Sequence, residues 1–581
     1  MRTQPTLSRQ WLLWAILVLG FTLRMLGIQF GLPHLYHADE PIIVNHALAY
    51  GSGDFNPHFF KIPPLVSYLV FICYGIYFLI GSLCRYFPDI QAFEYAFYAD
   101  PAPFYLMARV LFGAVLGTLT IVALYRIVLQ HFSKSKAILS AFFLAVCFLH
   151  VSDSHYVYAD IPLVFVMVIA MGVFFKLMEN GNRPRLHVMA GALIGLAVAT
   201  KYNGIVLAAP YLFASLAAVH SGGASTRKGK PQAAVSLQQL IFLWLIAGVA
   251  CGLTYAVLNP YSVLDFRFFL QELRQESRAH AGGTGWVHHF KNSLAGAMGV
   301  PLLLASCLGM LRVLWKRNRK AICAVVFVVS YYAVLCLWGQ VHARYVLPLV
   351  PFMLFLAADL LAEVSEQLPA PRRALWIWAL LVVFALPTLL KSLLFDRVMM
   401  AGDTRTQAQA WVETHIPAGA KIALDVPFFM PRLDFSQTQL EEKKREALSD
   451  PYFSNAKLRR LVFLLQRASS SVKPSYHLFF LKKEGEPADF LFAKPAAPYR
   501  VELLKAMGIE FVIAVRLRED YQTGFYDALR REGELLTTFS PYRGGTPKWP
   551  FLASITGGPF MFQDLWRRER NGQPIEIYRL K

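Results

Sequence analysis

Two adjacent carboxylates, Asp39 and Glu40, stand in a short polar stretch directly after the first apolar run of the sequence. A carboxyl group at the edge of an apolar region is partly desolvated, which raises its pKa toward the range where it can act as a general base. A further carboxylate, Asp160, lies in a second polar turn. Because Asp39-Glu40-Pro41 could equally cap the following helix, base catalysis and capping are both open on these residues alone.

Three cationic side chains, Lys61, Lys201 and Arg344, stand at similar boundaries between polar and apolar sequence. Each one alone is explained by a long side chain that reaches from a membrane span to the interface. Together with the carboxylates, they predict a site for a charged ligand such as a phosphate or pyrophosphate group. Arg can bind two phosphate oxygens at once, and Lys acts as a point charge.

The elements that must position these residues are membrane helices. Hydrophobic residues make up 56% of the sequence and charged residues 16%, and the mean hydropathy is +0.42. Over residues 1–395, apolar runs of about the length that crosses a ~30 Å hydrocarbon core recur between short polar breaks, and after Lys391 they stop. The sequence therefore predicts a membrane domain over residues 1–395 and a soluble domain over residues 396–581.

The soluble part alternates between helical and strand-like patterns, which indicates an α/β domain. Helices are expected over residues 404–416 and 501–507, and strands over 421–426 and 509–515. No catalytic constellation stands out in this part. It is interpreted either as a lid or acceptor-recognition domain, or as a passive domain that stabilises the outer face.

The net charge of +20 is carried largely by short loops between apolar runs, which points to membrane topology and not to nucleic acid. The positive-inside rule places six such loops in the cytoplasm, provided that residues 63–84 form an interfacial or re-entrant helix and do not cross. The N-terminus is then cytoplasmic and the C-terminal domain is outside. The expected crossings, about 11 in number, are residues 11–30, 104–130, 137–151, 158–179, 188–200, 204–219, 238–258, 292–315, 320–338, 345–363 and 374–395.

Two further features bear on function. The pair 188–200 and 204–219 is broken at Lys201-Tyr202-Asn203-Gly204, and a polar break is tolerated at membrane depth only where it is buried in protein or lines a wet cavity. The charged loop over residues 259–291 is expected to form an amphipathic external helix, either a gate over the site or solvated surface. All seven cysteines lie in or beside apolar segments, so no disulfide framework is predicted.

Short motifs recur in a fixed order along the membrane part. They are His37-Ala38-Asp39-Glu40-Pro41, Phe60-Lys61-Ile62-Pro63-Pro64-Leu65, Arg109, Tyr158-Ala159-Asp160-Ile161-Pro162, Gly195-Leu196-Ala197 with Thr200-Lys201-Tyr202-Asn203-Gly204, Asn259-Pro260-Tyr261, and Arg344-Tyr345-Val346-Leu347-Pro348. With these motifs the sequence resembles the GT-C lipid-linked glycosyltransferases. Within them it resembles the branch that includes bacterial protein O-mannosyltransferases and aminoarabinose transferases.

The resemblance implies a GT-C fold and a reaction. An acceptor hydroxyl on the outer face, of a protein, lipid or glycan, attacks the anomeric carbon of a hexose or pentose carried on polyprenyl phosphate, with inversion. Asp39 would be the base, and Glu40 would contact the acceptor or the sugar. Lys61, Lys201, Arg344 and Tyr345 would hold the leaving phosphate, and Asp160, His37 and Arg109 would order the external loops.

The resemblance leaves several points open. Some relatives use a divalent metal, and His34, His37, His46 and His58 could be imagined as ligands, but their spacing fits no known zinc signature. No cofactor is otherwise implied. The first-loop motif lacks the arginine-rich setting of some aminoarabinose transferases, so mannose, glucose, galactose and aminosugars all stay open. The family suggests a bacterial inner membrane.

The main alternative is a transporter or flippase for a lipid-linked or anionic substrate, which would also use a broken helix pair and charges at the membrane edge. The charged residues gather on one expected face and the sequence shows no inverted repeat, which favours the enzyme. A polymerase or ligase that uses lipid-pyrophosphate glycans is a closer enzymatic alternative. A receptor would leave the cluster of Asp39, Lys61, Lys201 and Arg344 without a purpose.

Overall fold

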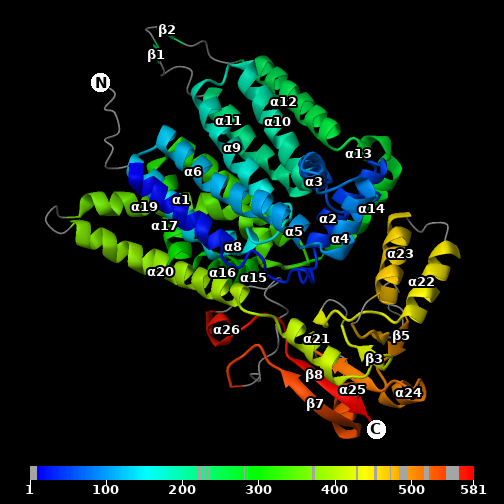
Figure 1. Ribbon diagram of the computed structural model, residues 1–581. Coiled ribbons are helices and arrows are strands. Elements are labelled where there is room, and N and C mark those ends of the chain that lie inside the picture. The colour runs from blue at the N-terminus through cyan, green and yellow to red at the C-terminus, as the bar shows by residue number, and fades with distance from the viewer. Residues whose placement is uncertain are drawn as a thin grey trace. The chain divides into compact units, whose positions relative to one another are not determined.

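The computed structural model divides the chain into two compact units (Figure 1). Unit 1 comprises Met1–Ile28, Asp39–Ile76 and Tyr105–Asp396, and unit 2 comprises Gln29–Ala38, Tyr77–Phe104 and Arg397–Lys581. The structure describes residues 10–219, 226–227, 230–231, 236–280, 282–283, 285–368, 373–426, 429–449, 455–470, 473–482, 495–515, 523–544 and 562–581.

Unit 1 is built almost entirely of helices, as its apolar composition dictates. In its first half these are α1 (Gln10–Met25), α2 (Glu40–Ala49), α3 (Leu65–Leu83), the π-helical η3 (Arg109–Val115), α6 (Leu116–His131), α7 (Lys134–Val146), α8 (Phe148–Asp153), α9 (Asp160–Glu179), α10 (Pro184–Thr200), η4 (Tyr202–Leu207) and α11 (Ala208–Val219). The second half holds α12 (Leu237–Leu258), α13 (Tyr261–Leu264), α14 (Phe266–His280), α15 (Trp286–His288), η5 (His289–Leu294), α16 (Ala295–Met298), α17 (Val300–Lys316), α18 (Arg319–Cys336), η6 (Ala343–Leu349), α19 (Val350–Gln367) and α20 (Arg373–Met400).

Among the described residues, eight helices are long and apolar enough to cross a membrane, or nine if one bent helix pair counts as a single span. Two shorter apolar helices, Trp11–Met25 and Pro184–Thr200, accompany them. The chain is therefore a multi-pass membrane protein. Helix α3 is among the helices that could cross, so the interfacial placement expected for it, and the orientation that depends on this placement, stay predictions.

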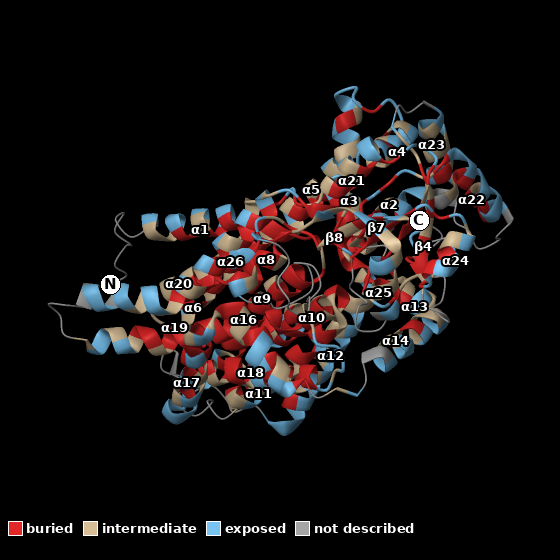
Figure 2. Cartoon of the chain, turned by 90° about the horizontal axis from the view of Figure 1, so that it is seen from below, coloured by how far each residue is buried: buried red, intermediate tan, exposed pale blue. Residues whose placement is uncertain are grey.

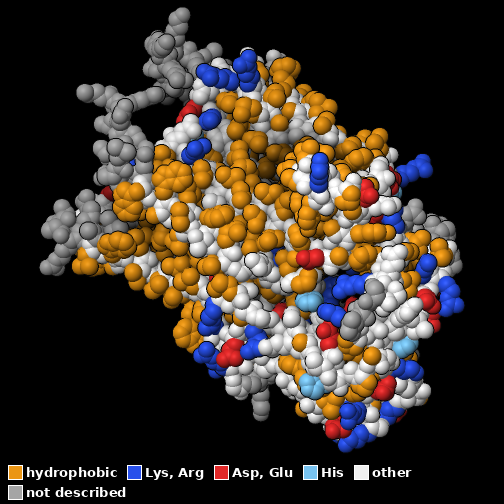
Figure 3. Space-filling model, viewed as in Figure 1, with side chains coloured by type: hydrophobic (Ala, Val, Ile, Leu, Met, Phe, Trp, Pro, Cys, Tyr) orange, Lys and Arg blue, Asp and Glu red, His pale blue; other side chains and the backbone are white. Residues whose placement is uncertain are grey.

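Two helices form the centre of unit 1. In α9 and in the combined helix Ala343–Gln367, 83% and 94% of the apolar window is buried inside the protein, whereas the figure for α12 is 17%. Figure 2 shows the buried positions gathered along the inner helices. Hydrophobic side chains cover the face of the bundle seen in Figure 3, and exposed leucine and valine side chains of α12 contribute to this lipid-compatible surface.

Close packing of α10 against α12 depends on glycine. A Cβ atom on Gly191 would lie 2.0 Å from the carbonyl oxygen of Ala247, and one on Gly195 would lie 2.4 Å from that of Cys251. Small residues let two membrane helices approach at backbone distance, where van der Waals packing replaces the missing hydrophobic drive. This packing fixes the C-terminal end of α10, which immediately precedes Lys201.

Unit 2 contains a mixed sheet with the strand order β5-β4-β3-β6-β8-β7. The parallel strands are β3 (Lys421–Leu424), β4 (His477–Lys482), β5 (Ala496–Pro498) and β6 (Phe511–Ala514), and the antiparallel pair is β7 (Gly533–Phe539) and β8 (Ile575–Leu580). Ile422 is in register with Leu478 of β4 and with Phe511 of β6.

Helices cover both faces of this sheet because alternate side chains of each buried strand are apolar. Ile422 and Leu424 of β3 pack with α21 (Thr404–His415), whereas Ala423 faces the cluster formed by α24 (Val501–Ala506) and α25 (Thr523–Glu532). The expected fold class, a polytopic helical membrane protein with a C-terminal α/β domain, is confirmed.

Two segments that precede residue 396 in sequence also belong to unit 2, which the sequence did not predict. Tyr36 donates or accepts a hydrogen bond with Thr406 at 3.0 Å. Helix α4 (Ile90–Ala99) pairs Glu94 with Arg459 at 2.8 Å on α23 (Asn455–Ser470), which packs with α22 (Gln437–Ser449). The proposed domain limits 1–395 and 396–581 stay a prediction.

Candidate functional site

Asp39 does not cap the helix that it precedes. It occupies the N-cap position of α2, but its side chain accepts no capping hydrogen bond. Instead the carboxylate forms an ion pair with Nη1 of Arg344. The side chains of Asp39 and Arg344 keep 27% and 21% of their surface exposed, so the pair is accessible from outside the protein. The Asp39 side chain therefore does not cap α2, and its role as a base stays a prediction.

Lys201 forms a second, deeper ion pair. Residue 201 ends α10 in an extended conformation, and its Nζ lies 2.7 Å from Oδ1 of Asp160, the first residue of α9. Oδ2 of Asp160 is buried and has no hydrogen-bond partner among the described residues. The polar break in the helix pair thus delivers a cation to a carboxylate at the start of the central helix.

Two tyrosine rings connect the two ion pairs. The ring of Tyr158 lies 4.9 Å from the guanidinium of Arg344 and 5.6 Å from Nζ of Lys201. The ring of Tyr345 lies 6.0 and 5.5 Å from the same two groups. These distances are within the range of cation–π attraction. We call Asp39, Asp160, Lys201, Arg344 and the two tyrosines the charge cluster.

Glu40 is engaged in a different contact. Its carboxylate receives two hydrogen bonds from Arg109, at 2.7 Å from Nε and 2.6 Å from Nη2, and both side chains are fully buried. The backbone N–H of Val157 donates to the same carboxylate at 3.0 Å, and Arg109 also donates to the carbonyl oxygen of Ile28 at 2.7 Å. Glu40 therefore ties the first loop to the turn that carries Tyr158, and its expected contact with the acceptor or the sugar stays a prediction.

Arg109 starts the π-helical stretch η3, a wide turn that is frequent at functional sites. A Cβ on Gly113 in this stretch would lie 2.2 Å from the backbone oxygen of Ser154. The wide turn and the glycine thus allow the helix to approach the turn that follows α8. Arg109 thus contacts both the first loop and the turn that follows α1, and its role in ordering these loops stays a prediction.

Lys61 is exposed and forms no ion pair with any described residue. Its loop is held by its neighbour Phe60, whose buried ring contacts Phe268 and Phe269 of α14 at centroid distances of 6.0 and 5.8 Å. The hydroxyl of Tyr202 donates to the carbonyl oxygen of Phe60 at 2.6 Å. The backbone beside Lys61 is therefore fixed to the residue that follows Lys201.

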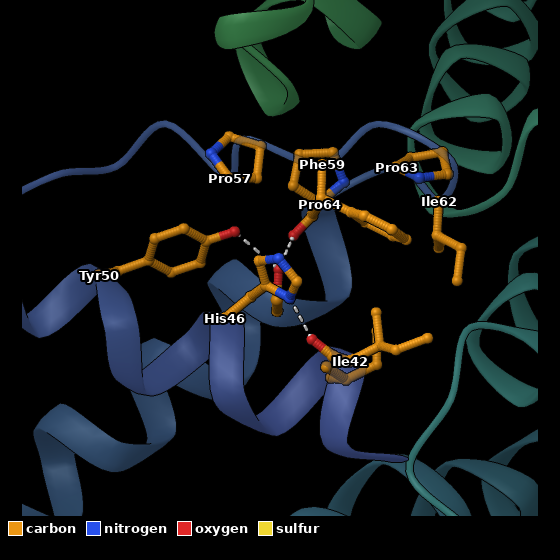
Figure 4. Close-up of a pocket in the computed structure, with 10 residues that line it drawn as sticks. Ile42, His46, Tyr50, Pro57, Phe59, Ile62, Pro63 and Pro64 are labelled. Atoms are coloured by element: carbon orange, nitrogen blue, oxygen red, sulfur yellow. Dashed lines mark hydrogen bonds between the residues drawn. The ribbon is translucent and has the colours of Figure 1, made fainter. Parts of the chain in front are cut away.

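A cavity of only about 10 Å³ lies beneath the same loop, between α2 and the segment from Pro57 to Pro64 (Figure 4). His46 bonds through Nδ1 to the carbonyl oxygen of Ile42, and Tyr50 and Ser67 share a hydrogen bond of 3.0 Å. The cavity has the size of a single water molecule. The cavity lies under the loop that carries Lys61, and it is too small for a substrate.

Three of the four histidines considered as metal ligands have other partners. His46 bonds to a backbone oxygen, His58 pairs with Asp54 at 2.9 Å, and His34 stacks on Tyr36. His37 is buried and belongs to the segment of unit 2 that precedes Asp39. In the part of the chain that the structure describes, no three His, Cys, Asp or Glu side chains are arranged to hold a metal. No step of the reaction is therefore derived through a metal.

Tyr158 was visible in the sequence only as part of a motif, and no role was predicted for it or for Asp153. Asp153 ends α8, and burial, together with the negative charge of Asp160, raises its pKa to about 7. Both residues stand in the turn between two apolar runs that also holds Asp160. The presence of two carboxylates in that one turn was the signal that could have indicated Asp153.

Residues 105–255 match the family described as dolichyl-phosphate-mannose-protein mannosyltransferase. The match covers less than half of the chain, and over this segment the chain is similar to that mannosyltransferase family. This segment contains Arg109, Tyr158, Asp160 and Lys201, whereas Tyr345 lies outside it. The resemblance drawn from the short motifs is confirmed by this match.

The comparison with known proteins gave two further results. No curated protein sequence matches the chain. Solved structures with similarity include ArnT from Cupriavidus metallidurans in the apo state, at 13% identity and a TM-score of 0.47 over 98% of this chain and 97% of that one. The same protein bound to undecaprenyl phosphate gives 14% identity and a TM-score of 0.45 over 92% and 97% of the two chains.

The archaeal oligosaccharyltransferase AglB from Archaeoglobus fulgidus, in complex with an inhibitory peptide and a dolichol-phosphate, is also similar. It gives 10% identity and a TM-score of 0.45, with 92% of this chain and 74% of that chain covered. Structural similarity at TM-scores below 0.5 does not indicate a shared activity. The glycosyltransferase relationship therefore rests on the family match.

Proposed function

We propose that the chain transfers a sugar from a polyprenyl-phosphate carrier to a hydroxyl of an acceptor on the extracytoplasmic side of the membrane. The observation that carries the proposal is the charge cluster, in which Arg344 and Lys201 share two tyrosine rings and each is paired with one carboxylate. Two cations that share the same tyrosine rings, each at the start of an apolar helix, suit a phosphate whose lipid tail extends into the membrane. The matching family is described by a lipid-phosphate sugar donor.

The donor phosphate would exchange partners with the carboxylates. Arg344 has a buried Nε without a hydrogen-bond partner among the described residues, so it can donate to a phosphate oxygen in addition to its Nη1 pair. A phosphate held by Arg344 and Lys201 competes with Asp39 and Asp160 for the same cations, because like charges repel at close range. Binding of the donor would thereby release Asp39 from Arg344.

The released Asp39 would act as the base. The oxygen of the acceptor hydroxyl forms a bond to the anomeric carbon, its proton goes to Asp39, and the bond from that carbon to the phosphate oxygen breaks with inversion. Polyprenyl phosphate leaves with the electron pair as a stable anion. Lys201, Arg344, Tyr345 and the exposed Lys61 would stabilise the charge that grows on the phosphate, which lowers the barrier.

The remaining site residues would act by position. Glu40 and Arg109 hold the turn of Val157 against the first loop, and Asp160 holds Lys201 until the donor arrives. We place the protein in a bacterial inner membrane, with its N-terminus in the cytoplasm and its C-terminal domain in the periplasm. The experiment below identifies the sugar, and transfer to protein, lipid or glycan acceptors identifies the acceptor class.

The test is sugar transfer by the purified protein in lipid, with a panel of radiolabelled polyprenyl-phosphate sugars. We expect turnover or slow donor hydrolysis that is lost in Asp39→Asn, while donor binding is kept. Asp54→Asn is the matched control, because Asp54 is an exposed carboxylate of the same unit that contacts His58 and the backbone N–H of Asn56 and no residue of the charge cluster. Labelled lipid or solute that crosses sealed vesicles without consumption of donor would instead establish a transporter and refute the catalytic roles.

A further inference from the structure

Tyr158 is the residue of the charge cluster that no role yet explains. Its ring is in contact with both cations, Arg344 at 4.9 Å and Lys201 at 5.6 Å, and it is half-buried. The turn around it is tied down on both sides. Val157 donates its N–H to Glu40, and Asp160 binds Lys201. The ring is thus held in place by the same contacts that order the two loops.

The ring offsets a repulsion that the site cannot avoid. Arg344 and Lys201 both lie within 6.0 Å of the centroids of the same two aromatic rings, so each ring faces two positive charges. The negative faces of the rings attract both cations and keep them at a fixed spacing. This contribution persists when a phosphate displaces the carboxylates, because the rings do not depend on the ion pairs.

The hydroxyl of Tyr158 is available to a ligand. It makes no hydrogen bond with any described residue, whereas the hydroxyls of Tyr202 and Tyr331, from the same region, bond to Phe60 and Asn203. Tyr158 is half-buried, so part of the residue keeps an exposed surface. A phenol is protonated at neutral pH and can donate a hydrogen bond to an anion.

We propose that Tyr158 is a further donor-binding residue, whose ring fixes the spacing of Lys201 and Arg344 and whose hydroxyl donates a hydrogen bond to a non-bridging oxygen of the polyprenyl phosphate. The inference deepens the proposed function and rests on it. It assigns to one side chain both the preorganisation of the cations and a direct contact with the leaving group. Tyr345, which is buried, supplies the second ring.

The test separates the ring from the hydroxyl. Polyprenyl phosphate without sugar is titrated into the wild-type protein, Tyr158→Phe and Tyr158→Leu, and sugar transfer is measured in parallel. Tyr158→Phe keeps the ring and loses the hydrogen bond to a charged group, so we expect binding to weaken about 10-fold. Tyr158→Leu loses the ring as well, and its binding should fall several-fold further. Tyr95→Phe, which removes an exposed phenol of unit 2 and keeps its ring contact with Phe463, is the matched control and should bind as wild type.

The outcomes distinguish this inference from the function on which it rests. Wild-type protein that binds no polyprenyl phosphate would refute the proposed function and the role of Tyr158 with it. Wild-type protein that binds and turns over, together with Tyr158→Phe that binds equally well, would refute the role of Tyr158 alone. Because Tyr158→Phe removes a single oxygen, its heat-unfolding midpoint should equal that of the wild type, which keeps the comparison valid.

Discussion

Arg344 and Asp39 form an ion pair although 305 residues separate them in the sequence. The pair joins the loop before α2 to the start of the central helix Ala343–Gln367. It leaves the proposed base neutralised by the residue that we propose for the donor phosphate. The order of events follows from this competition, because the donor must bind before Asp39 is free to accept a proton.

Replacement of Arg344 by lysine should weaken donor binding and spare the fold. Lysine keeps the positive charge and its attraction to Asp39, but it cannot donate to two phosphate oxygens from one planar group. We expect the KM for the polyprenyl-phosphate sugar to rise about 10-fold, the cost of one hydrogen bond to a charged partner. Steady-state kinetics over a range of donor concentrations measures this change. An unchanged KM would remove Arg344 from the phosphate site.

Replacement of Glu40 by glutamine should destabilise the protein strongly. The change leaves the guanidinium of Arg109 fully buried without a counter-charge, which costs about 3 kcal/mol or more. Heat unfolding in detergent, followed by tryptophan fluorescence, should show a clearly lower midpoint. The double variant Glu40→Met, Arg109→Met should regain part of the loss, because neither charge is then left alone.

An exposed ion pair is the control for this prediction. Arg543 and Glu569 lie 2.9 Å apart with 76% and 40% of their side chains exposed. Glu569→Gln should cost less than about 1 kcal/mol, as is usual for pairs in water. Equal losses for Glu40→Gln and Glu569→Gln would contradict the structural role of the buried pair.

Asp153 should make the stability of the protein depend on pH. Its pKa is raised to about 7, above that of an exposed aspartate, so the folded state keeps a proton that the unfolded chain has already lost. Stability should therefore fall as the pH rises from about 4 to 7 and level off above that range. Asp153→Asn should flatten this dependence. Unfolding midpoints of both proteins at several pH values test it, and parallel curves would show that Asp153 titrates normally.

Replacement of Gly204 by alanine should disturb the break that carries Lys201. A Cβ at this position would lie 2.4 Å from the backbone carbonyl carbon of Ala197, so the backbone of α10 or η4 must shift. We expect a loss of about 1–3 kcal/mol in the free energy of unfolding, with reduced donor binding. Gly248→Ala on α12 is the matched control, because its Cβ would have no neighbour within 4 Å. If Gly204→Ala changed neither the free energy of unfolding nor donor binding, the backbone at the break would tolerate the added methyl group.

Much of the architecture could be predicted from the sequence because it depends on local composition. Apolar runs long enough to span a membrane have few alternatives to a helix, since backbone polar groups must be satisfied inside the segment. The alternation of helical and strand-like patterns likewise indicated β3 and β6 to within a few residues. The placement of Asp39, Lys201 and Arg344 at boundaries between polar and apolar sequence was also visible in the sequence alone.

The partners of those residues could not be predicted in the same way. Asp39 and Glu40 are neighbours of the same chemical type, yet one binds Arg344 near the surface and the other binds Arg109 in full burial. The segments Gln29–Ala38 and Tyr77–Phe104 join unit 2 through contacts with residues more than three hundred positions away. Local sequence fixed which residues could carry charge at the membrane edge, whereas only the tertiary structure decided which charge meets which. The reason is that ion pairing depends on distance in space and on burial, and neither is set by the neighbours of a residue along the chain.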